Sequence, residues 1–144
     1  MRALLLLFVL CLTSDVKAQL LTWSPDFIRD TGTSAIEIIA DARRGNKGLQ
    51  GYSNLTDVYV HIGVITSLSS SQTDWKYVKF SSFSTPNAPA RCTSLGDDRW
   101  KFDIPGGLRT FFNITNAGER ILRIAILLQN GAGTQVLRNA DGSD

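Results

Sequence analysis

Hydrophobic and polar residues alternate along several short stretches of the chain, most clearly over residues 57–66, DVYVHIGVIT. The even positions of this stretch are β-branched apolar residues: Val58, Val60, Ile62 and Val64. Side chains alternate between the two faces of a β-strand, so the pattern predicts a strand with its even face in a core. The odd face carries Tyr59 and His61, the single histidine of the chain, and we therefore expect function on that face.

Similar alternation or apolar runs predict further strands, separated by glycine, proline and asparagine turns, over residues 21–24, 35–41, 75–80, 90–95, 99–104, 120–129 and 134–138. One helical turn is expected over residues 108–113. This pattern predicts an all-β, immunoglobulin-like sandwich of about seven to eight antiparallel strands. The expected core comprises Ile36, Ile38, Val58, Val60, Ile62, Val78, Phe102, Ile124 and Ile126, and Trp100 and Trp23 are expected to be buried as well.

The two ends of the chain differ from this pattern. Arg2, the apolar run 4–12 and the small residues Val16 and Ala18 predict a secretory signal peptide over residues 1–18, with cleavage after Ala18. Residues 19–144 are then one module, secreted or at the cell surface. After the Asp141-Gly142 turn little sequence remains, so either a last strand is missing or the chain is a fragment of a longer protein. An apolar groove or an unpaired strand edge should then remain.

Composition excludes several classes of function. The chain has 144 residues and a net charge of +2, its basic residues are scattered, and nucleic-acid binding is not expected. The run 4–12 is too short to span a membrane, so no span is expected after cleavage. Outside the leader Cys92 stands alone, which precludes an internal disulfide and indicates a small buried hydrophobe.

No catalytic constellation is found, and the chain is not expected to be an enzyme. His61 is the one possible imidazole base, and no G-x-S-x-G motif accompanies it. Asp41, Asn46, Asp141 and Asp144 are weak calcium candidates in glycine-rich loops, and no EF-hand spacing links them. Solvated turns are the favoured interpretation, so no cofactor is expected. Asn54 and Asn113 begin two glycosylation sequons.

A carbohydrate-binding face has more support. Sugar rings stack on aromatic side chains, and their hydroxyls pair with amide, carboxylate and imidazole groups. Tyr59 and His61 share one face of their strand, Trp75 and Tyr77 share the outward face of the next, and neighbouring strands would join them into one patch. Gln129 and Asn130 could add amide hydrogen bonds. In the alternative interpretation, this face is covered and Trp75 belongs to the core.

The strings GNKGLQGYSNLTDVYVHIGVIT, DWKYVKF, LGDDRWKFDI and ILLQNGAGTQVLRNADGSD together carry a resemblance. They are similar to an N-terminal β-sandwich module of secreted Bacteroidetes amylase-like glycoside hydrolases and related glycan-handling proteins. More distantly, the chain resembles small starch-binding modules, where Tyr59 and His61 would match a strand pair that stacks on glucose and Trp75 the following tryptophan. The resemblance implies a further strand after residue 144.

Three hypotheses follow from the residues and the resemblance. The first is a non-catalytic carbohydrate-binding module for α-glucan, starch-like, in a secreted amylase-like protein. Its partners would be a polysaccharide or oligosaccharide and a downstream catalytic domain of the same parent protein. The second is a structural immunoglobulin-like spacer that positions such a domain and has no ligand of its own. A catalytic fragment ranks last.

Overall fold

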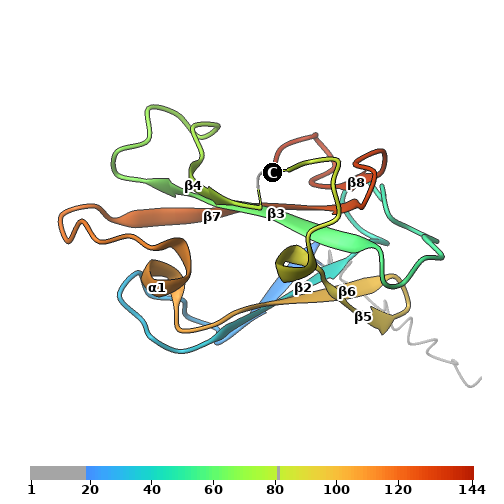
Figure 1. Ribbon diagram of the computed structural model, residues 1–144, viewed down its shortest axis with the longest axis horizontal. Coiled ribbons are helices and arrows are strands. Elements are labelled where there is room, and N and C mark those ends of the chain that lie inside the picture. The colour runs from blue at the N-terminus through green and yellow to red at the C-terminus, as the bar shows by residue number, and fades with distance from the viewer. Residues whose placement is uncertain (1–18, 81) are drawn as a thin grey trace, which may run out of the picture.

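The computed structural model describes residues 19–80 and 82–144, which form two antiparallel four-stranded sheets packed face to face (Figure 1). Sheet A has the strand order β1 (Leu21–Ser24), β2 (Ile36–Asp41), β6 (Arg99–Ile104), β5 (Thr93–Gly96). Sheet B has the order β4 (Lys76–Lys79), β3 (Val58–Thr66), β7 (Ile121–Asn130), β8 (Val136–Leu137). A 3-10 turn, η1 (Ala88–Ala90), and a short helix, α1 (Leu108–Phe112), complete the elements. The predicted all-β sandwich is confirmed, and the predicted signal peptide lies outside the described residues.

Strand β3 lies at the centre of sheet B because both of its faces are apolar enough to be covered. Its even row points into the core, and Val58, Ile62 and Val64 have no exposed surface. Strand β7 pairs with it antiparallel, with Ile62 opposite Ile126 and Val60 opposite Leu128. Cross-strand partners share a face, so the even rows of both strands form one apolar layer.

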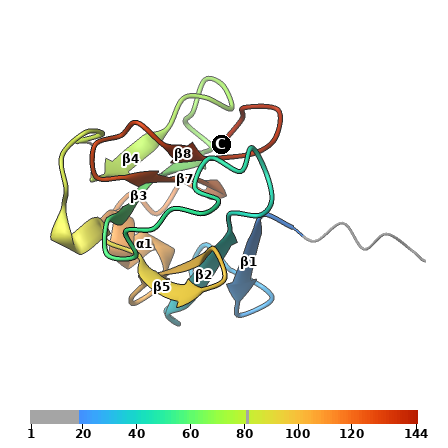
Figure 2. The same cartoon turned by 90° about the vertical axis from the view of Figure 1, so that its right-hand side faces the viewer.

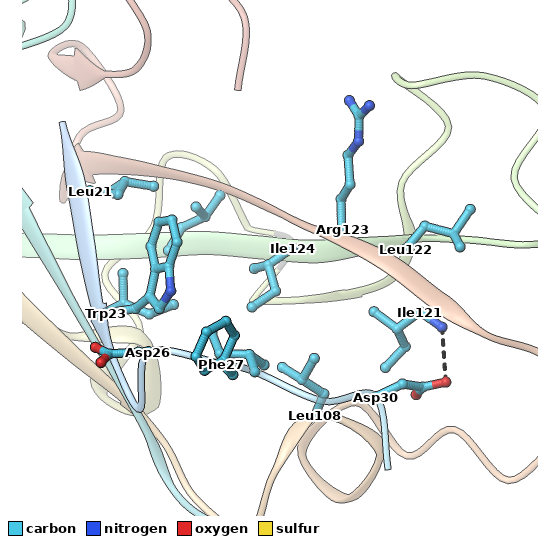
Figure 3. Close-up of a pocket in the computed structure, with 13 residues that line it drawn as sticks. Leu21, Trp23, Asp26, Phe27, Asp30, Leu108, Ile121, Leu122, Arg123 and Ile124 are labelled. Carbon is cyan, nitrogen blue, oxygen red and sulfur yellow. Dashed lines mark hydrogen bonds between the residues drawn. The ribbon is translucent and has the colours of Figure 1, made fainter. Parts of the chain in front are cut away.

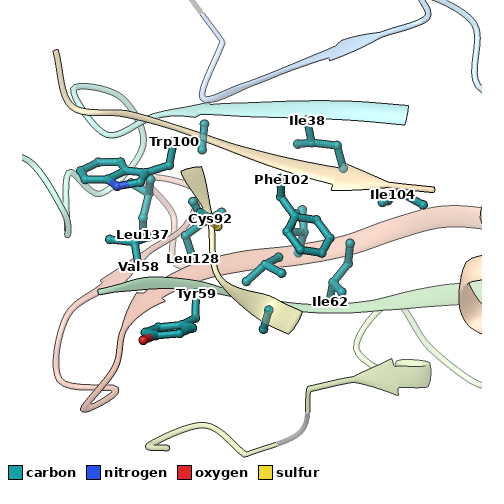
Figure 4. Close-up of a cluster of buried hydrophobic side chains, with 14 of the residues drawn as sticks. Ile38, Val58, Tyr59, Ile62, Cys92, Trp100, Phe102, Ile104, Leu128 and Leu137 are labelled. Carbon is teal, nitrogen blue, oxygen red and sulfur yellow. The ribbon is translucent and has the colours of Figure 1, made fainter. Parts of the chain in front are cut away.

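The core fills the space between that layer and sheet A (Figure 4). Ile38, Trp100, Phe102 and Ile104 reach it from sheet A, and each is buried. Complete burial of one such side chain stabilises the fold by about 1.5–3 kcal/mol. The predicted core residues that are buried are Ile36, Ile38, Val58, Val60, Ile62, Phe102 and Ile126.

Three core predictions need correction. Val78 and Ile124 are half-buried. Trp23 was expected inside the core, but 47% of it is exposed. It belongs to β1, the edge strand of sheet A (Figure 2). Its side chain borders a groove at that edge. The buried Trp100 confirms the prediction made for it.

One end of the sandwich is tied together by α1. The guanidinium of Arg109 donates to the carboxylate of Asp30 at 3.0 Å and to the carbonyl of Glu119 at 2.8 Å. Phe111 and Phe80 add their rings, 6.4 Å apart, to the partly buried apolar layer. These contacts fix the loop before β2 and the segment before β7, and therefore the position of β7.

The last strand of sheet B is much shorter than its neighbour. Strand β8 pairs with Leu128 and Gln129, and within the described residues 121–127 have no strand partner on that side. Beside this open edge lies an apolar groove of about 510 Å³ between β1 and β7. This arrangement matches the expectation of an apolar groove and an unpaired strand edge.

Candidate functional site

Trp75 lies on the outer face of sheet B, the face that points away from the core. It directly precedes β4, and its indole covers Gly63 of β3: a Cβ atom built on that glycine would be 3.2 Å from Trp75 Cε3. The rings of Trp75 and His61 are 5.4 Å apart between centroids and inclined at 30°. The two side chains that the sequence predicted as site residues are therefore neighbours.

His61 is held in place by two further contacts. Its Nδ1–H donates to the carbonyl oxygen of Phe80 at 3.3 Å. The ring of Phe83 meets its edge with centroids 5.5 Å apart. Trp75, His61 and Phe83 thus form a cluster of three rings on the outer face, which we call the aromatic cluster. Its geometry is set by the backbone of β4 and the loop that follows it.

A hollow of about 370 Å³ adjoins the aromatic cluster at Trp75. Its floor is the outer face of sheet B, with Ile65 and Ala125. Its polar lining comes from the turn after β3, from β7 and from the C-terminal turn: Gln72, Thr73, Arg123, Asn139, Ser143 and Asp144. Arg123 donates to the Gln72 side-chain oxygen at 3.0 Å, which orients both groups. One indole wall with amide, hydroxyl, guanidinium and carboxylate groups around it is suited to a polyhydroxylated ligand.

Tyr59 does not lie in an exposed patch, so that expectation is wrong. It has 5% exposure, because the segment before β5 passes over it. The Arg91 guanidinium lies 5.7 Å from the centre of its ring and donates to its hydroxyl at 3.4 Å. Figure 4 shows the ring directed away from the core side chains. An aromatic on the outer face is thus covered by the chain itself and has no surface for a sugar.

Gln129 and Asn130 are buried as well, at 3% and 7% exposure. Gln129 is paired across the sheet with Tyr59. The Asn130 side-chain oxygen accepts from the main-chain nitrogens of Thr134 and Gln135 at 2.8 and 3.0 Å and so closes the turn before β8. Both amides are internal, and their predicted role as ligand contacts at the surface is wrong.

Tyr77 is exposed, but it is directed toward Glu119. Its φ of 52° interrupts the alternation of β4, and its hydroxyl donates to the Glu119 carboxylate at 2.6 Å. This hydrogen bond raises the pKa of Tyr77. Hydrogen bonds from Thr66 and then Tyr77 lower the pKa of Glu119. The pair joins β4 to the segment before β7, which is a structural role.

Three of the four calcium candidates are engaged by their own chain. The Asp41 carboxylate accepts from Arg43 at 2.8 Å, which lowers the pKa of Asp41. The Asn46 side chain donates to the Val136 carbonyl at 2.9 Å, and Asp141 accepts from Ser143 at 2.7 Å. In the part of the chain that the structure describes, no group of three or more metal-ligating His, Cys, Asp or Glu side chains is found.

Cys92 is buried within the core and is a free cysteine among the residues that the structure describes. Burial raises the pKa of its thiol to about 12. A thiol in this state is a poor nucleophile, because the thiolate is the reactive form. The sequence-based interpretation of Cys92 as a small buried hydrophobe is confirmed.

Several residues of the hollow and the cluster were not anticipated. Phe83 lies in a loop without periodicity, and the polar lining comes from turns whose composition is that of ordinary solvated loops. A possible signal was the density of Ser, Thr and Gln between residues 67 and 73, directly before the predicted Trp75. Its proximity to residues 139–144 depends on the fold and could not be inferred from spacing.

No protein-family model and no curated protein matches this sequence. Across residues 19–80 and 82–144, no helix is both long and apolar enough to cross a bilayer.

Proposed function

We propose that this chain is a non-catalytic carbohydrate-binding module that binds α-glucan oligosaccharides at Trp75 and the adjoining hollow. One observation carries the proposal: an indole on the outer face of sheet B forms one wall of a hollow of about 370 Å³ whose other side chains are mostly polar. A pyranose ring has apolar C–H faces and a rim of hydroxyls. The indole suits the first and the polar lining suits the second.

A sugar bound here would contact one stacking ring and a few hydrogen-bonding side chains. His61 supports the indole from the side at 5.4 Å, so Trp75 keeps a fixed orientation in the absence of ligand. Arg123 and Gln72 are already bonded to one another at 3.0 Å and can share their remaining hydrogen-bonding capacity with a hydroxyl. Stacking on one ring with a few hydrogen bonds corresponds to a dissociation constant on the order of 10–1000 μM.

Under this proposal the rest of the sequence acquires a role. Residues 1–18 direct export, so the module meets polysaccharide outside the cell. The bound polymer is the substrate of a catalytic domain in the same parent protein, and the module raises the local concentration of that substrate. The choice of α-glucan comes from the resemblance to starch-binding and amylase-associated modules.

The proposal is tested by titrating the purified protein with maltooligosaccharides and, in parallel, with cellooligosaccharides. Isothermal titration gives the affinity, and tryptophan fluorescence reports on Trp75. Saturable binding of the α-linked series is expected, and Trp75→Ala should weaken it at least about tenfold, because one large aromatic often dominates a small contact. Trp75→Phe should retain part of the affinity.

Trp23→Ala is the matched control, since Trp23 is an exposed indole on the other sheet. It should leave saccharide binding unchanged. Circular dichroism of each variant establishes that the fold is kept. A flat titration with every glucan, by a folded wild-type protein, would leave the structural spacer as the better account of the chain.

A further inference from the structure

The groove of about 510 Å³ between β1 and β7, which we call the edge groove, is shown in Figure 3. It shares Arg123 and Ile124 with the lining of the proposed saccharide site and is otherwise formed by different residues. Leu21, Trp23 and Phe27 form one wall of it, and Ile121 and Ile124 of β7 form the other. Its lining is mainly apolar. The rim exposes Phe27 at 86%, Leu122 at 57% and Trp23 at 47%, which are among the most exposed large apolar side chains of the described residues. Exposed apolar side chains gathered at one groove mark an interaction site.

The main chain beside the groove indicates what kind of ligand fits. In an antiparallel sheet, alternate residues direct their N–H and C=O groups to opposite neighbours. One set of these groups in β7 is bonded to β3. On the other side, among the described residues, β8 pairs with Leu128 and Gln129 alone. At the start of the strand, the Ile121 N–H donates to the Asp30 carboxylate at 3.3 Å. Residues 122–127 therefore present main-chain donors and acceptors to any extended segment placed alongside them.

The edge carries few of the features that usually prevent such pairing. Natural edge strands are protected by charged side chains, proline or bulges. Residues 121–127, ILRIAIL, contain no proline, and Arg123 is their one charged residue. A register shift against β3 is confined to the start of this stretch, between Ile121 and Arg123. An added strand would point alternate side chains between the sheets. There they would contact Ile124 and Ile126 on one side and Trp23 on the other, where the groove has room for them.

We propose that the edge groove accepts an extended β-strand of another polypeptide, with bulky apolar residues at alternate positions, paired with Leu122–Leu127 of β7. The unpaired main chain sets the strand conformation of the ligand, and the apolar groove sets the period of its side chains. A lipid chain would fill the groove but would leave the edge of β7 unpaired.

The test uses the purified protein and a capped octapeptide that alternates Ile and Thr. Saturable binding is expected, together with new protection from hydrogen exchange, measured by NMR, at those amides of residues 122–127 that point away from β3. A peptide N-methylated at the amides that face β7 should bind at least about tenfold more weakly, because it has lost its main-chain donors. The same peptide N-methylated at the alternate amides is the matched control and should bind like the parent.

Protein variants identify the groove as the place of binding. Trp23→Ala and Phe27→Ala should each lower the affinity for the peptide several-fold, because both side chains border the groove. Leu68→Ala is the control: Leu68 is 61% exposed in the turn after β3, away from the groove. The Leu68→Ala variant should bind the peptide with the affinity of the wild type.

Four results would overturn the proposal. The first is a flat peptide titration, and the second is equal affinity for both N-methylated peptides. The third is competition by phosphatidylcholine vesicles, which would make the groove a lipid site. In the fourth, the amides among residues 122–127 that point away from β3 are protected before any peptide is added. A dimer in solution would then identify a second copy as the occupant, and a monomer would identify the chain itself.

Discussion

At the scale of single residues, Gly63 decides how close β4 and Trp75 come to β3. Glycine in a strand interior costs about 0.5–1 kcal/mol relative to alanine, and Gly63 is flanked by Ile62 and Val64, which favour strands. It leaves room for the indole to lie against the backbone of the outer face. His61 then meets the indole at 5.4 Å. Because Gly63 has no side chain, the indole of Trp75 can pack against β3 beside His61.

Gly63→Ala should disturb this packing. The new Cβ would lie 3.1 Å from the Lys76 carbonyl oxygen and 3.2 Å from both Trp75 Cε3 and Val78 Cγ2, closer than carbon atoms normally pack. We expect a loss of about 1–3 kcal/mol in the free energy of unfolding, measured by denaturant titration, and a changed near-UV circular dichroism from Trp75.

Gly118→Ala serves as the comparison, because a Cβ there meets a single atom at 3.4 Å. It should change stability by no more than about 0.5 kcal/mol. If Gly63→Ala were equally neutral, the indole would not be packed against β3 in solution.

At the scale of elements, β4 shows where sequence patterns lose their power. Alternation predicted β3 and β6 well, because each lies between two partner strands. In β4 the left-handed conformation of Tyr77 and a register shift beside Gly63 break the alternation. Val78 consequently lies over Gly63 beside Trp75 instead of in the core.

The burial of Tyr59 has a different origin from the error in β4. Period two correctly assigned Tyr59 to the outer face of β3, opposite the core row. A strand pattern shows which face a residue occupies and says nothing about which loop covers that face. Arg91 is distant in sequence and reaches Tyr59 because the chain crosses from sheet B to sheet A there. Long-range covering of this kind could not be predicted from the strand alone.

The hydrogen bond between Tyr77 and Glu119 makes the anchoring of β4 dependent on pH. The folded-state pKa of Glu119 is lowered below 4.5, so its stabilising effect is complete above that pH and is lost as the pH falls through the folded pKa. The pKa of Tyr77 is raised above 10.0, so its effect is complete below that pH and is lost as the pH rises through the folded pKa. The pair therefore stabilises the fold most between these limits.

Comparison of wild type with Glu119→Gln tests this dependence. The difference in unfolding free energy, from urea titrations at several pH values, should be largest near neutral pH and shrink below pH 4.5. Tyr77→Phe should behave similarly at the alkaline end, with its difference shrinking above pH 10.0. A difference that stays constant over the whole range would show that the carboxylate is not bonded to the tyrosine in solution.

At the scale of the whole molecule, the sandwich is closed unequally at its two long edges. At the edge formed by β4 and β5, the segment from Phe83 to Arg91 packs on His61 and Tyr59. At the opposite edge, the Asn46 main-chain N–H donates to the Arg138 carbonyl at 3.0 Å directly after β8. Between β1 and β7 the core instead opens into the edge groove. Core residues near that opening are supported on fewer sides than those beneath the centre of β3.

Two truncations measure this difference. Ile62 has no exposed surface and lies in the centre of β3, so Ile62→Ala should cost about 2–5 kcal/mol, the range for apolar truncation in a packed core. Ile124 of β7 lies on the same face of sheet B as Ile62, but it borders the edge groove and its side chain is half-buried. Its truncation leaves a space that is already open to solvent, so Ile124→Ala should cost about half as much or less. Chemical denaturation of both variants gives the two values.

If the octapeptide pairs with β7, saturating peptide should widen the loss of unfolding free energy caused by Ile124→Ala, because the added strand packs on Ile124. The loss caused by Ile62→Ala should stay nearly unchanged. Equal losses without peptide would mean that the groove is closed in solution.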